Sequence, residues 1–122
     1  MSEMLLGTYM GWRLTYPQAR SWLTKAGIDT SKYNTEELEA DMLSRLVNLL
    51  EEKKIYPDKV SITPFDDPET HEPMFVLIRM VVYNWKKAAL PERNEDQELK
   101  KELLESSGFK DEEVPWRTYY QG

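Results

Sequence analysis

The chain has 122 residues, no cysteine and a formal net charge of −6, from 16 basic and 22 acidic side chains. This length predicts a single globular domain over residues 1–122 with a core of its own, and the lack of cysteine excludes disulfides, thiolate metal sites and cysteine nucleophiles. The acidic balance disfavours nucleic acid and anionic membranes as partners, because phosphate groups need a basic surface.

The first predicted element is a strand over Leu5–Leu14, where large apolar and aromatic side chains alternate along the chain. Two glycines, Gly7 and Gly11, interrupt the alternation. Glycine inside a strand indicates a bulge or the close approach of another segment.

Two helices are predicted to follow. Thr15 and Gln18 have the spacing of a capping box at the start of the first, and Gly27 suits the left-handed position just beyond its end. The second begins at Asn34, carries a leucine-rich apolar stripe and ends near Lys54, before a proline.

The next segment favours a strand pair. A short run over residues 59–63 favours a strand. Residues 64–73 contain three prolines and four carboxylates, and they are predicted to form a loop that leads to an antiparallel partner strand. The loop contains His71, the only histidine. Its neighbours match no metal or catalytic spacing, so we predict no metal site and no catalytic residue here.

The longest apolar run, Met74–Trp85, holds a single charge, Arg79. Its β-branched and aromatic residues favour a central strand over Met74–Tyr83. The competing interpretation is one continuous helix over residues 74–90, with the polar side chains in one stripe.

The last elements are a helix and a short strand. Asn94 and Gln97 have capping-box spacing, and Gly108 suits the end of that helix. Pro115–Tyr120 is predicted to be an edge strand or a tail laid across the sheet. The order β-α-α-β-β-α-β predicts an α+β fold, a two-layer sandwich with helices packed on one face of a small, mostly antiparallel sheet.

Alternation divides the strand side chains between two faces. We assign the even-numbered residues of Met74–Val82 to the helix layer and the odd-numbered ones to the outer face. With the first strand alongside, that outer face is predicted to gather aromatic rings and two arginines: Tyr9, Arg13, Phe75, Arg79, Tyr83 and Trp85.

Aromatic and arginine side chains on one face are typical of protein contacts. We therefore predict a small non-enzymatic interaction module that binds a protein partner or a second copy of itself through this face. The alternative is an aromatic or anionic metabolite at the same face, in a binding protein or a small enzyme. Two further interpretations need no partner: residues 115–120 cover the face as a second small core, and Arg79 forms an internal ion pair.

The sequence contains no serine nucleophile motif, phosphate loop or metal-ligand spacing, so no catalytic residue and no cofactor is predicted. The first residues lack the basic and apolar regions of a signal peptide, and no apolar run is long enough for a membrane span. We expect a cytoplasmic protein. A further hypothesis is a structural or inhibitory protein that acts through its acidic second half.

Overall fold

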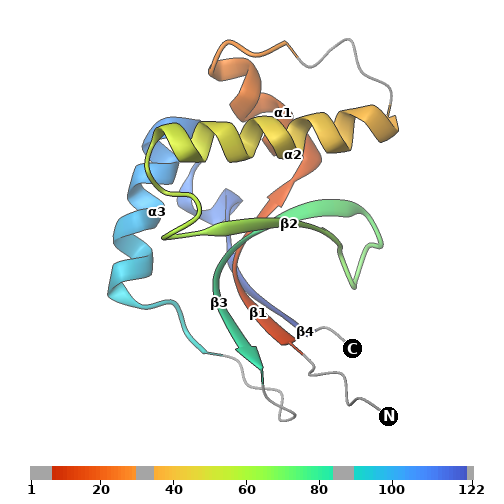
Figure 1. Ribbon diagram of the computed structural model, residues 1–122. Helices are drawn as coiled ribbons and strands as arrows, with labels where there is room; N and C mark the ends of the chain where they lie inside the picture. Colours follow the sequence, from red (N-terminus) through yellow and green to blue (C-terminus); the bar gives the residue numbers. More distant parts are fainter. Residues whose placement is uncertain (1–6, 30–34, 84–89, 121–122) are drawn as a thin grey trace.

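The computed structural model describes residues 7–29, 35–83 and 90–120 (Figure 1). The elements, in chain order, are β1 (Gly7–Thr15), α1 (Tyr16–Lys25), α2 (Thr35–Glu52), β2 (Ser61–Asp66), β3 (Pro73–Tyr83), α3 (Asn94–Ser107), the short 3-10 helix η1 (Asp111–Glu113) and β4 (Trp116–Tyr120). Apart from η1, this is the predicted order, and the α+β class is confirmed.

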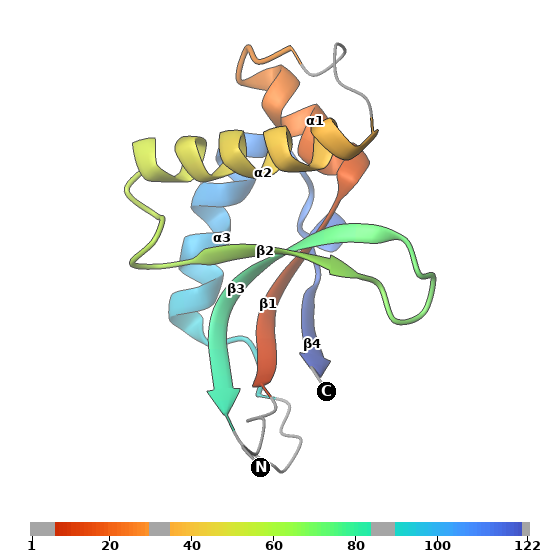
Figure 2. The same cartoon turned by 45° about the vertical axis from the view of Figure 1, so that its right-hand side comes forward.

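The described strands form one antiparallel sheet in the order β2-β3-β1-β4. The strand β3 is one of the two inner strands, and the helical interpretation of residues 74–83 is therefore wrong; residues 84–89 lie outside the described part. The helices lie on one side of the sheet, with β4 at its far edge (Figure 2). No helix within the described ranges is long and apolar enough to cross a membrane.

The main core lies between the sheet and the helices. Trp12 of β1 lies directly opposite Leu77 of β3, and Leu14 lies opposite Phe75, so these four side chains share one face. The helices contribute buried side chains that pack against these four: Ala19, Trp22, Leu23, Met42, Leu46, Leu50, Leu99 and Leu103.

The ends of α1 form as the sequence predicts. The Thr15 hydroxyl accepts a hydrogen bond from the backbone N–H of Gln18 at 3.3 Å, and the Gln18 side chain accepts one from the backbone N–H of Thr15 at 2.9 Å. After the helix, Gly27 has a φ of 87° and the N–H of Ile28 donates to the carbonyl of Leu23 at 2.9 Å. This is the Schellman ending that satisfies the last carbonyl groups of a helix.

The end of α2 near Lys54 and the left-handed Gly108 at the end of α3 form as predicted, whereas the start of α3 differs. Lys54, with a φ of 60°, occupies the left-handed position after α2 that glycine usually takes. At the start of α3 the capping pair is shifted by one residue from Asn94 and Gln97. Arg93 is the N-cap, and its backbone N–H donates to the carboxylate of Asp96 at 2.9 Å.

The strand β2 extends further than the sequence predicts. Pro64 lies inside it, opposite Phe75 of β3, and the connecting loop is residues 67–72. Proline lacks a backbone donor, but β2 lies at the edge of the sheet that the described strands form, where it pairs on one side only. An edge strand tolerates proline where a central strand does not.

A bulge in β3 explains why position 11 is a glycine. Met10 pairs with Met80 and Gly11 pairs with Ile78, so Arg79 is an extra residue on β3. A Cβ atom on Gly11 would lie 1.9 Å from the carbonyl oxygen of Leu77. The close approach predicted for this glycine is confirmed.

We predict that Gly11→Ala lowers the free energy of unfolding by about 3 kcal/mol, because the added methyl group meets backbone atoms of β3 that cannot move independently. Gly27→Ala is the matched control. It has open space around the new methyl group and should cost about 1 kcal/mol for its left-handed backbone. Urea unfolding measures both, and equal losses would contradict the steric explanation.

Candidate functional site

The sheet curls away from the helices, and its two edges meet. In a flat sheet β2 and β4 would lie about 14 Å apart, at roughly 4.8 Å per strand. The rings of Phe65 on β2 and Tyr119 on β4 nevertheless have centroids 5.2 Å apart. The hairpin of β2 and β3 arches over the side of the sheet that faces away from the helices (Figure 1).

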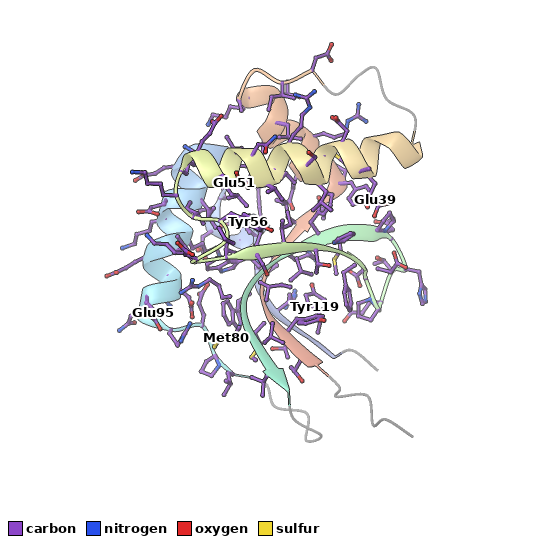
Figure 3. The ribbon with its side chains drawn as sticks, viewed as in Figure 1. Glu39, Glu51, Tyr56, Met80, Glu95 and Tyr119 are labelled. Carbon is purple, nitrogen blue, oxygen red and sulfur yellow. The ribbon has the colours of Figure 1, made fainter. Side chains whose placement is uncertain are left out.

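We call this side the curled face. Its members are four side chains that stand over three floor residues: Tyr9, Arg13, Phe65 and Tyr119 over Met74, Val76 and Ile78. Figure 3 shows Tyr119 on the side of the strands below the hairpin, whereas Met80 and Glu95 lie on the other side, toward α3.

The floor of the curled face is a second small core. Val76 is 0% exposed and Met74 is 2% exposed, although the helices pack on the opposite face. Tyr119 lies over them, and Tyr9 meets Phe65 edge to face with centroids 6.5 Å apart. The prediction that residues 115–120 cover this face is thus partly confirmed: β4 pairs in the sheet as an edge strand, and its Tyr119 ring covers the floor.

Two polar groups of the curled face lack strong partners. The Nε of Arg13 is buried and has no hydrogen-bond acceptor among the described residues. The Tyr119 hydroxyl donates to the sulfur of Met74 at 3.9 Å, a weak acceptor. Burial raises the pKa of Tyr119 to about 12, the charge of Arg13 opposes this shift, and the carboxylates of Asp67 and Glu69 favour it.

The curled face therefore presents a buried cationic donor beside a phenol that keeps its proton at neutral pH. Its border is partly apolar, because Val81 follows the bulge on β3 and is 37% exposed. Arg117 of β4 lies opposite Gly11 on the same side and is exposed. These groups can donate hydrogen bonds to an anionic oxygen, and the border can contact apolar groups.

The structure separates the six residues predicted for the outer face. Tyr9 and Arg13 do lie together on the curled face. Phe75 does not: it is 0% exposed in the main core, where its ring stacks on Tyr16 with centroids 4.8 Å apart. The backbone of Tyr83 pairs with Gly7. The side chain of Tyr83 and all of Trp85 lie outside the described residues.

The assignment of β3 faces was wrong for residues 74–79, and the reason is register. Alternation shows which side chains share a face, but it does not show which face meets the helices. Pairing of Trp12 with Leu77 turns the odd-numbered residues Phe75, Leu77 and Arg79 toward the helices. The bulge at Arg79 then reverses the alternation, so Met80 shares the face of its partner Met10.

Two aromatic members of the curled face were missed. Phe65 lies between prolines in a segment predicted to be loop, and its cross-strand partner is Met74. Tyr119 belongs to the predicted last strand, where alternation with Arg117 places both on one face. That alternation was the available signal, but the pairing of this strand with β1 was not evident from the sequence.

The interpretation of Arg79 as an internal ion pair is confirmed. Its Nε lies 2.6 Å from Oδ1 of Asp96 on α3, and its Nη1 donates to the carbonyl of Lys59. Asp96 is 0% exposed and also accepts from the Nε of Arg93 at 2.9 Å. The Arg79–Asp96 ion pair connects α3 to the bulge of β3.

Burial raises the pKa of Asp96, but the hydrogen bonds from the Arg93 side chain and backbone and from Arg79 outweigh it, and the pKa falls to about 2 from the ordinary 3.8. A carboxylate held this strongly serves stability, because no exposed surface of it remains to meet a ligand.

No group of three or more histidine and carboxylate side chains in residues 7–29, 35–83 and 90–120 is arranged to hold a metal ion. His71 lies exposed in the hairpin loop. Neither a protein-family model, nor a curated protein, nor a solved structure matches this chain.

We predict that wild-type stability falls as the pH drops from about 4 to about 2. The folded pKa of Asp96 lies below its ordinary value, so its contribution is complete above pH 4 and is lost as the pH falls through about 2. The loss is about 2 kcal/mol.

Asp96→Asn removes this titration, so the difference in unfolding free energy between wild type and variant should narrow by that amount between pH 6 and pH 2. Glu98→Gln, which removes an exposed carboxylate from the same helix, is the control for the loss of one negative charge. A constant difference for Asp96→Asn across this range would show that the ion pair does not titrate as described.

Proposed function

We propose that this chain is a non-enzymatic binding module whose curled face holds an acidic segment of a partner protein. The observation that supports this proposal is the buried Nε of Arg13, which has no acceptor among the described residues. An unsatisfied buried donor costs about 1–3 kcal/mol, and more when it is charged. A carboxylate placed against it would recover that cost.

The chemistry around Arg13 favours a carboxylate over a neutral group. A guanidinium forms its strongest hydrogen bonds with anionic oxygen. The nearby Tyr119 hydroxyl keeps its proton at neutral pH, because its pKa is about 12. It can therefore turn from the weak sulfur acceptor to donate a second hydrogen bond to the same anion.

A protein segment suits this face better than a free small anion. The whole chain carries a net charge of −6, which repels small anions at long range. A peptide can compensate through apolar contacts with the exposed Val81 and the partly buried rings of Tyr9 and Phe65. An anionic or aromatic metabolite is the alternative occupant, and the experiment below distinguishes it.

The test is selection of a random peptide library displayed on phage against the immobilised chain. We expect enriched peptides with Asp or Glu next to an apolar residue. Arg13→Gln should weaken them about tenfold or more, because a charged hydrogen bond contributes about 1.5–3 kcal/mol. Its stability should stay near wild type, since the Nε that it removes has no hydrogen-bond partner among the described residues.

Arg20→Gln is the matched control, because Arg20 is an exposed arginine on α1, in the helix layer. It should leave peptide affinity unchanged. Enriched peptides without an acidic residue, or peptides indifferent to Arg13→Gln, would contradict the proposal. Benzoate, an aromatic carboxylate, is titrated in parallel by tryptophan fluorescence; saturation that depends on Arg13, without peptide enrichment, would assign the face to a metabolite.

A further inference from the structure

The free edge of β4 differs from the free edge of β2. Within the described residues, each of these strands pairs on one side only. Natural proteins protect open edges with proline and inward or edge charges. The strand β2 contains Pro64 and ends in Asp66, whereas β4 has the sequence Trp-Arg-Thr-Tyr-Tyr, with no proline, no carboxylate and one arginine.

The backbone groups on this edge can be assigned. Arg13 donates its N–H to the carbonyl of Pro115 at 3.1 Å, in line with the pairing of Trp12 and Trp116. Successive residues of a strand direct their N–H and C=O groups to alternate sides. Arg117 and Tyr119 therefore bond to β1, while Trp116, Thr118 and Tyr120 direct their backbone groups to the open edge.

We infer that β4 pairs with β4 of a second copy of this chain, antiparallel and centred on Thr118, so that two sheets join into one. The outward groups of the five-residue strand would then form about six backbone hydrogen bonds across a two-fold axis. The inference concerns the edge of the sheet and does not depend on what the curled face binds.

Charge selects this register. Centring the pair on Arg117 would place two guanidinium groups opposite each other, which is unfavourable. Centring on Thr118 places Arg117 across from Tyr119 of the second copy, in a pair without backbone hydrogen bonds, where side chains approach most closely. Tyr119 is uncharged at neutral pH, because burial raises its pKa to about 12, so the incoming Arg117 meets no second positive charge directly opposite.

The first test needs no variant. Backbone amide exchange is measured by NMR at protein concentrations that span roughly a hundredfold range. We expect protection of Thr118 and Tyr120 to rise about tenfold or more with concentration, since their N–H groups are buried only in the dimer. The amides of Arg117 and Tyr119, which bond to β1, should be protected at every concentration. Exchange of Thr118 that is fast and independent of concentration would overturn the inference.

The second test is the mass in solution, measured by sedimentation. Thr118→Pro removes the central outward N–H and leaves the bonds to β1 in place, so the variant should be monomeric where wild type is dimeric. Thr118→Val, which keeps the N–H and a branched side chain, should remain dimeric. A folded Thr118→Pro variant that still dimerises would place the contact elsewhere.

Failure of this inference is distinguishable from failure of the proposed function. Arg13→Gln should change peptide affinity and leave the mass unchanged, whereas Thr118→Pro should change the mass. If Thr118→Pro does not fold, the concentration dependence of the Thr118 amide in wild type decides the question.

Discussion

The rest of the structure depends on the close pairing of β1 with β3 at Gly11. The Leu77 carbonyl occupies the space that a side chain on Gly11 would need, and the register shifts by one residue beside it. The extra residue, Arg79, bends β3 and increases its twist, as bulges do. The hairpin of β2 and β3 then arches over the face that the helices leave open (Figure 1).

This bend gives β3 two cores. Before the bulge, Phe75 and Leu77 pack against the helices, while Met74, Val76 and Ile78 are buried beneath Tyr119 and Phe65. A strand buried on both faces has no need of alternating polar residues. That burial explains why the longest apolar run of the chain is this strand. The same bend turns Arg79 toward α3, where Asp96 neutralises it.

Charged side chains are paired differently on the two faces of the sheet. Asp96 of α3 pairs with Arg93, at the start of the same helix, and with Arg79 of β3, on the helix side of the sheet. On the opposite face, Arg13 has a buried donor that finds no acceptor in the described part of the chain, although the chain as a whole is acidic. Because one fold can serve many functions, the proposed function rests on the surroundings of Arg13 and not on the α+β architecture. The inferred pairing of two chains rests separately on the edge of β4, which pairs on one side only among the described residues.

The sequence by itself determined the local structure. Period-two and helical patterns, with capping residues such as Thr15 and Gln18, depend on neighbours in the chain, so they predicted the order of the elements and the class of the fold. Only the tertiary structure decided which face of β3 meets the helices, that β2 continues through Pro64, and that Phe65 and Tyr119 close over Val76. Those features depend on strand register and on contacts between residues more than forty positions apart, as in the Tyr119–Met74 contact. A one-residue bulge reverses every side chain that follows it, and no local pattern in the sequence reveals such a shift.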